Sequence, residues 1–198
     1  MAMQIKTPGG LIKLAVILVA VVVVGVLLWQ RVYGTYRLIE IEKSVVYSTG
    51  LRSVEDLNNA ALSSRARCIL LCSDTVELET PLLSASQTYA FHSKLRVEDF
   101  RVGPGAWPTS DNIDAALQVI GKASRRPVLI ASADGVRRPG MVVAAYLTSV
   151  LKYDKIAAMK RIGELYGDVP GLADVGRFLE VYEPASQKVT RQLPLSKE

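Results

Sequence analysis

The chain has 198 residues, of which 49% are hydrophobic, and its formal net charge is +5. When an apolar N-terminal segment and a polar tail are set aside, about 150 residues remain, enough for one domain whose core needs no disulfide or metal. The positive charges are dispersed along the chain instead of forming a basic block, which argues against a nucleic-acid-binding protein. The single histidine, His92, has no Cys, His or carboxylate neighbour at ligand spacing, so we expect no metal site and no cofactor.

An apolar run near the N-terminus predicts a membrane anchor. Residues 11–29 are apolar except for Lys13, and as a helix they would reach about 28 Å, close to the hydrocarbon thickness of a bilayer. We therefore expect a flank at residues 1–10, a single transmembrane helix at 11–30 and a juxtamembrane linker at 31–43. The expected location is a membrane, the bacterial inner membrane.

A cleaved signal peptide is the alternative to an anchor. Such a peptide ends in small residues at its cleavage site, whereas this run ends in Trp29 and Gln30 followed by Arg31. The sequence leaves the orientation open, because Lys6 and Lys13 before the run balance the basic residues after it.

The remaining sequence alternates between strand and helix patterns. Strands are expected at 44–47, 68–72, 89–95 and 127–131, helices at 53–63, 109–120, 139–150, 155–166 and 172–182, and a Gly- and Pro-rich loop at 98–108, while 74–87 is ambiguous. This order predicts an α/β domain at 44–184, with a mostly parallel sheet flanked by helices in three layers, and a polar tail at 185–198. Within one strand Cys68 and Cys72 would lie about 13 Å apart, too far for a disulfide, so both are expected to be buried thiols.

One strand–turn–helix segment has the build of an anion site. A buried strand stops at Ala131, a turn containing Gly135 follows, and a helix begins near Pro139. Backbone N–H groups in such a turn, together with the helix dipole, bind anions, and the guanidinium of Arg138 could add paired hydrogen bonds to a phosphate. The expected phosphate-binding loop comprises Ser132, Ala133, Asp134, Gly135, Val136, Arg137 and Arg138.

This segment resembles the phosphate-binding loop of the cysteine-dependent tyrosine and dual-specificity phosphatases, His-Cys-x-x-Gly-x-x-Arg-Ser/Thr-Gly. Residues 46–57 are similar to the first strand and helix of bacterial members, and residues 98–112 resemble the loop that carries their general acid. The resemblance implies a three-layer phosphatase fold. It makes Asp99 the candidate general acid, with Glu98 and Asp111 as alternatives.

Three departures from the family motif surround the nucleophile. Ser132 stands at the position of the catalytic cysteine, Ala131 at that of the histidine, and Pro139 at that of the Ser/Thr. Family members attack phosphorus with a thiolate, whereas a serine hydroxyl stays protonated unless a base removes its proton. An engineered Cys-to-Ser change would explain Ser132 but not the other two positions. Active relatives tolerate an acid in the loop, so Asp134 is not expected to prevent anion binding.

The sequence therefore predicts a degenerate phosphatase, or pseudophosphatase. Such a protein would be a membrane-anchored binding or regulatory module, tethered by residues 11–29, that recognises a phosphorylated protein or another phosphomonoester. Two alternatives remain. One is an active phosphatase with a non-standard nucleophile, and the other is a structural membrane protein whose loop binds nothing.

Overall fold

The computed structural model describes residues 13, 15–25, 36–73, 81–102 and 107–183, in two units, Met1–Gly34 and Thr35–Glu198. In the first unit, residues 15–25 are helical. No helix in the described part of the chain has both the length and the apolar character needed to cross a membrane. The rest of the predicted anchor, the flank at 1–10, the linker at 31–35 and the tail at 185–198 lie outside the described residues.

A five-stranded sheet forms the centre of the second unit. Its strands are β1 (Ile39–Glu42), β2 (Val46–Gly50), β3 (Cys68–Ser73), β4 (Arg96–Arg101) and β5 (Val128–Ser132). They lie in the order β1-β2-β5-β3-β4, with β1 antiparallel at one edge and all other neighbours parallel. The predicted sheet, mostly parallel, is confirmed.

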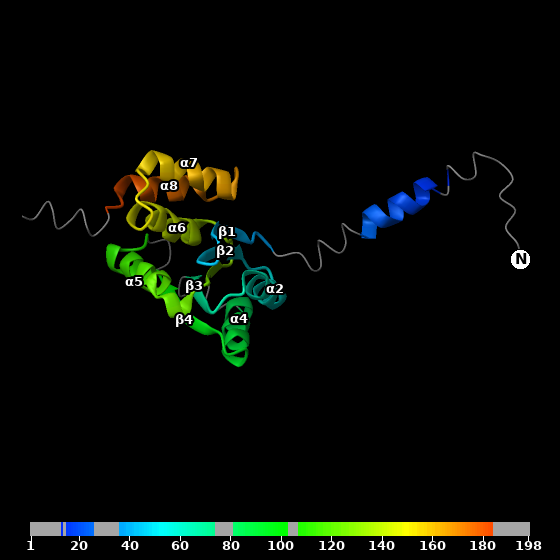
Figure 1. The fold of residues 1–198 in the computed structure, drawn as a ribbon, viewed down its shortest axis with the longest axis horizontal. Coiled ribbons are helices and arrows are strands. Elements are labelled where there is room, and N and C mark those ends of the chain that lie inside the picture. The colour runs from blue at the N-terminus through cyan, green and yellow to red at the C-terminus, as the bar shows by residue number, and fades with distance from the viewer. Residues whose placement is uncertain (1–12, 14, 26–35, 74–80, 103–106, 184–198) are drawn as a thin grey trace, which may run out of the picture. The chain divides into compact units, whose positions relative to one another are not determined.

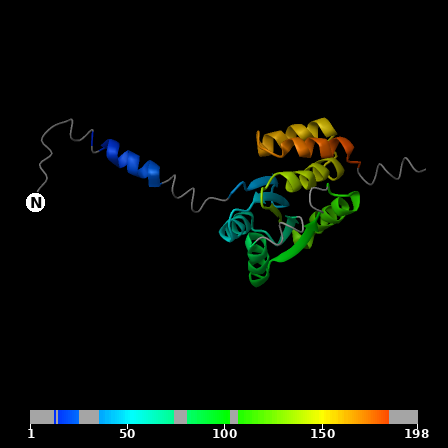
Figure 2. The same cartoon turned by 180° about the vertical axis from the view of Figure 1, so that it is seen from behind.

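Helices cover both faces of this sheet. They are α2 (Val54–Ser64), α4 (Pro81–His92), α5 (Ser110–Gly121), α6 (Arg137–Ser149), α7 (Lys155–Tyr166) and α8 (Leu172–Val181). One buried cluster joins α5, α6, α7 and α8 to the sheet, and a second joins α2 and α4 to its other face. Seen from both sides, α6, α7 and α8 lie together (Figures 1 and 2). The three-layer α/β architecture is thereby confirmed.

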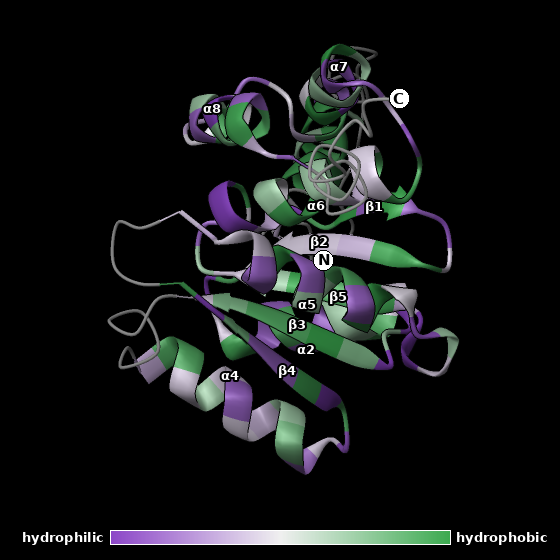
Figure 3. Ribbon diagram, turned by 90° about the vertical axis from the view of Figure 1, so that its left-hand side faces the viewer, coloured by the Kyte–Doolittle hydropathy of each residue, from purple (hydrophilic) through white to green (hydrophobic). Residues whose placement is uncertain are grey.

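Strand β3 shows why the sheet is buried on both sides. Each of its residues is buried, and they alternate between the two clusters: Leu70 and Cys72 face α6, while Ile69 and Leu71 face α2 and α4. Figure 3 shows β3 as hydrophobic along its length, whereas the edge strand β4 carries hydrophilic residues. Neither cysteine forms a disulfide and both are buried, as predicted, and burial raises the pKa of the Cys68 thiol to about 11.

Two helix starts follow the capping chemistry of the sequence. The Ser53 side chain accepts from the backbone N–H of Asp56, whose carboxylate accepts from the N–H of Ser53 in return. Thr109 and Asn112 form the same reciprocal pair at the start of α5. Thr109 is thus the N-cap of α5.

Two predicted elements in the middle of the chain are wrong. The strand expected at 89–95 lies mostly in α4, whose buried face is formed by Leu83, Ser86 and Ala90 at helical spacing. The loop expected at 98–108 begins too early, because its first residues, through Arg101, belong to β4. The charged residues of this edge strand resemble a polar loop in sequence. In addition, β1 lies within the range expected to be a linker, so the folded unit begins before residue 44.

Candidate functional site

The site is the turn between β5 and α6, at the carboxyl end of the parallel strands. Gly135 lies at its centre with φ of 70°. A Cβ on Gly135 would lie 2.5 Å from both the Cα and the nitrogen of Gly50, the last residue of β2. The turn is therefore pressed against the neighbouring strand, and only glycine satisfies both the conformation and the space.

Ser132 lies at the base of the turn and is buried, at 1% relative exposure. Its Oγ accepts a hydrogen bond from the N–H of Gly135 at 2.9 Å and donates one to Oδ1 of Asp134 at 2.9 Å. Both hydrogen-bonding roles of the hydroxyl are thus filled within the turn. Ala131, where the family motif has histidine, is buried among the apolar residues packed against α2 and α4.

The carboxylate of Asp134 is the acceptor at the start of α6. Oδ1 accepts from the N–H of Val136 at 3.0 Å, and Oδ2 accepts from the N–H of Arg137 at 3.3 Å. These N–H groups have no partner inside the helix and carry its positive dipole end. The Asp134 carboxylate therefore accepts from backbone N–H groups at the start of α6, and the residue as a whole is exposed to solvent.

The remaining predicted loop residues are in place around this turn. Arg138 is buried at 8% relative exposure in the first turn of α6, and Arg137 forms an ion pair with Asp174 of α8 at 3.0 Å. Helix α6 begins at Arg137, two residues before the predicted start. Pro139 is thus in the first turn, where a missing N–H costs nothing.

A second layer of residues, from the start of the folded unit, supports the turn. The guanidinium of Arg37 donates to the backbone carbonyl of Asp134 at 3.0 Å. The carbonyl of Tyr36 accepts from Thr49 Oγ1 at 2.9 Å and from the N–H of Gly50 at 3.3 Å. The sequence pattern assigns residues 36 and 37 to the linker and does not predict this support.

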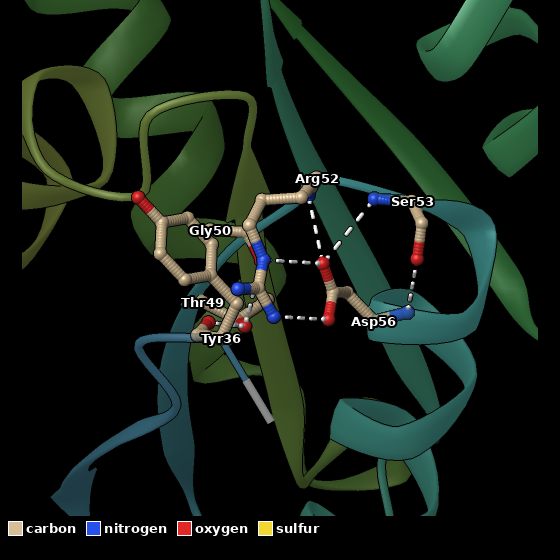
Figure 4. Close-up of polar contacts among 6 residues, drawn as sticks. All are labelled: Tyr36, Thr49, Gly50, Arg52, Ser53 and Asp56. Carbon is tan, nitrogen blue, oxygen red and sulfur yellow. Dashed lines mark hydrogen bonds and ion pairs between the residues drawn. The ribbon is translucent and has the colours of Figure 1, made fainter. Parts of the chain in front are cut away.

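Figure 4 shows how the ring of Tyr36 is held over the end of β2. The guanidinium carbon of Arg52 lies 4.4 Å from the ring centroid, a cation–π contact. The same guanidinium forms two hydrogen bonds of 3.2 Å to the carboxylate of Asp56, which is buried at the start of α2. Polar contacts thereby link the end of β2 to the start of α2 beside the turn.

The candidate general acids are not brought to the turn. Asp99 lies in β4, where it forms an ion pair with Arg101 at 2.8 Å. In the sheet, Leu71 of β3 pairs with Asp99 on one side and with Ala131 on the other, so β3 lies between Asp99 and β5. At the usual strand spacing the Cα atoms of Asp99 and Ala131 are about 10 Å apart. Glu98 pairs with Arg125 at 2.8 Å, and Asp111 is exposed in the first turn of α5.

A buried hydroxyl lies behind the site on β2. Tyr166 of α7 donates to Ser48 Oγ at 2.9 Å, and burial raises the pKa of this tyrosine, so it stays a neutral donor.

Within the described ranges, no group of three or more His, Cys, Asp or Glu side chains is placed to hold a metal ion. The site is a polar turn made of backbone amides, arginines and one carboxylate.

Comparison with known proteins supports this architecture through structure alone. No family model and no curated protein matches the chain. Among solved structures it is similar to a P. aeruginosa TpbA variant that has serine in place of a cysteine and is in complex with pTyr. The identity is 17% and the TM-score 0.58, and the match covers 78% of this chain and 89% of that one. It is also similar to the catalytic core of the PP-IP phosphatase SIW14 from S. cerevisiae, at 13% identity and a TM-score of 0.62, covering 80% and 94%. A third is PTPMT1 in complex with PI(5)P, at 20% identity and a TM-score of 0.57, covering 72% and 94%.

These neighbours are cysteine-dependent protein tyrosine and dual-specificity phosphatases. The chain has their fold, and the turn after β5 lies where the sequence motif predicts the phosphate-binding loop.

Proposed function

We propose that this protein is a phosphatase-like module that recognises a phosphorylated group without hydrolysing it. The observation that carries the proposal is the position and the hydrogen bonding of Ser132. It stands where the motif has its nucleophile, and its hydroxyl is already bonded to the carboxylate of Asp134 at 2.9 Å. The turn keeps the parts that hold an anion, namely backbone N–H groups at a helix start and two arginines, while the sulfur that attacks phosphorus is replaced.

The neighbouring positions favour the same proposal. Without a histidine at Ala131 or a hydroxyl at Pro139, the loop lacks the groups that the family motif places around the nucleophile. The first candidate general acid, Asp99, pairs with Arg101 and is separated from β5 by a strand. In this arrangement Asp99 is not placed to protonate a leaving alkoxide or phenolate at the turn.

The proposed ligand is a phosphorylated protein or another phosphomonoester. Among proteins of this fold, a serine-for-cysteine variant of TpbA is found with pTyr, and PTPMT1 is found with PI(5)P. The first case supports the idea that a protein of this fold that carries serine in place of a cysteine can still hold a phosphoryl compound.

Anion binding is tested by a thermal melt of the full chain in detergent. Inorganic phosphate at 100 times its dissociation constant should stabilise the folded state by about 2.7 kcal/mol, a shift of several degrees for a domain of this size. Arg138→Lys should reduce this shift, because an ammonium group cannot form the paired hydrogen bonds of a guanidinium. If phosphate leaves the melt unchanged at any concentration, the loop binds nothing and the protein is structural.

We further propose that residues 11–29 anchor the protein in a membrane, the bacterial inner membrane. The apolar length of this run supports the proposal, and the side on which the folded unit lies is left open. The full chain should remain in the membrane pellet after an alkaline carbonate wash, whereas a chain starting at residue 31 should appear in the supernatant. Full release of the complete chain would contradict an integral anchor.

A second function has one observation in its favour. The Asp134 carboxylate accepts a hydrogen bond from the Ser132 hydroxyl at 2.9 Å and could act as the base that activates a serine nucleophile. Such an enzyme would hydrolyse an aryl phosphate without metal, and both Ser132→Ala and Asp134→Ala would abolish that hydrolysis. Carboxylates are weak bases for an alcohol, and two backbone N–H groups already share this one, so we favour the binding module.

A further inference from the structure

The carboxylate of Asp134 lies on the donors that an anion would use. Its two oxygens take the N–H groups of Val136 and Arg137, and Oδ1 also takes the Ser132 hydroxyl. These donors are the ones that a turn before a helix offers to phosphate. In geometry and in charge, the side chain stands in for a bound anion.

We propose that Asp134 is an internal anion that closes the phosphate loop, so that a ligand binds only when this carboxylate swings out. The inference rests on the proposed function, because it concerns the same loop and the same class of ligand. The anion site of the loop would then be closed by Asp134 until a ligand displaces this side chain, instead of being permanently open.

The backbone around Asp134 is fixed, so the release involves the side chain alone. Arg37 holds the carbonyl of Asp134 at 3.0 Å, and a Cβ on Gly50 would lie 3.3 Å from that same oxygen. The Gly135 backbone is pressed against Gly50 as well. Asp134 is itself exposed, so rotation of its side chain carries the carboxylate into water without opening the core.

This arrangement sets a charge threshold for the ligand. A phosphoryl group carries between one and two negative charges and three strong acceptor oxygens, whereas the carboxylate carries one charge and two oxygens. A phosphomonoester can therefore displace the side chain where a single carboxylate or a chloride ion would gain nothing. The apparent dissociation constant is the intrinsic one divided by the fraction of time for which the carboxylate is swung out. A loop that is mostly closed therefore binds its ligand more weakly than an open one.

The test compares Asp134→Ala with Asp174→Ala in the full chain in detergent, with inorganic phosphate as the probe. Both changes remove one negative charge near the start of α6, but Asp174 contacts the Arg137 side chain and not the backbone N–H groups. We expect Asp134→Ala to tighten phosphate binding at least tenfold and Asp174→Ala to change it by less than threefold. In the ¹⁵N-labelled native chain, the amide signals of Val136 and Arg137 should shift only at phosphate concentrations higher than those that saturate Asp134→Ala.

The outcomes separate this proposal from the one on which it rests. If the native chain and Asp134→Ala bind phosphate equally well, the internal anion is refuted while anion recognition stands. Equal gains from both variants would reduce the effect to general electrostatics and would also refute it. If neither chain binds phosphate and no amide signal moves, the proposed function itself fails. A melt without ligand confirms that each variant is folded.

Discussion

Changing Ser132 to Cys alone leaves hydrolysis of an aryl phosphate at least about a hundredfold slower than in a chain that also carries Ala131→His, Asp134→Ala and Pro139→Thr. The single variant restores sulfur but not the surroundings that make a thiolate. A thiol at this position would lie beside the carboxylate that now accepts from the Ser132 hydroxyl at 2.9 Å. A neighbouring negative charge raises the pKa of a thiol and so keeps it protonated at neutral pH.

The three accompanying changes act on that pKa in different ways. Asp134→Ala removes the competing charge and frees the N–H groups of Val136 and Arg137 for the thiolate or the substrate. Pro139→Thr supplies a hydroxyl within the first turn of α6, and Ala131→His restores the histidine of the family motif. Each step should lower the pH at which iodoacetamide alkylates the new cysteine, and the hydrolysis rate should rise in the same order.

The matched control is the chain with the three accompanying changes and native Ser132. It should remain inactive, since it has the surroundings without the nucleophile. Full activity in the Ser132→Cys variant alone would show that the other positions do not matter, and our account of them would then be wrong. The buried Cys68 and Cys72 provide an internal reference, because their alkylation in the folded protein should be slow in every variant.

Local capping chemistry and burial made most of the fold predictable. The reciprocal pair of Ser53 and Asp56 defines the start of α2 through contacts between residues close in sequence. The uninterrupted apolar run of β3 required a strand covered on both faces. The turn after β5 was predictable because a buried strand, a glycine and a helix start follow one another closely.

The errors arose where tertiary contacts decide the structure. The segment 89–95 has aromatic residues typical of a strand, but α4 is selected by the packing of Leu83 and Ala90 against α2 and the sheet. The contact of Arg37 with the turn is formed across about 100 residues of sequence, for which no local pattern exists. The role of Asp134 did have a local signal, since an aspartate side chain commonly accepts hydrogen bonds from backbone N–H groups two or three residues further along the chain.

Gly135→Ala should be among the most destabilising single changes in the folded unit, with a loss of about 3 kcal/mol. The backbone at Gly135 has φ of 70°, which costs an alanine roughly 1–2 kcal/mol. The new Cβ would also lie 2.5 Å from the Cα and nitrogen of Gly50 and 3.1 Å from the carbonyl carbon of Thr49. These are backbone atoms of β2, so no side chain can rotate to make room.

The loss should appear as a fall in melting temperature of roughly 6–12 °C. Gly163→Ala is the matched control, because Gly163 lies in α7 and a Cβ added there would meet nothing within 4 Å, so alanine should stabilise the helix by about 0.5–1 kcal/mol. Opposite shifts from the same chemical change would show that the contact with β2, and not the methyl group, sets the cost. A melting temperature within about 2 °C of the native chain for Gly135→Ala would mean that the turn is not pressed against β2. The geometry on which both the anion site and its internal carboxylate depend would then fail with it.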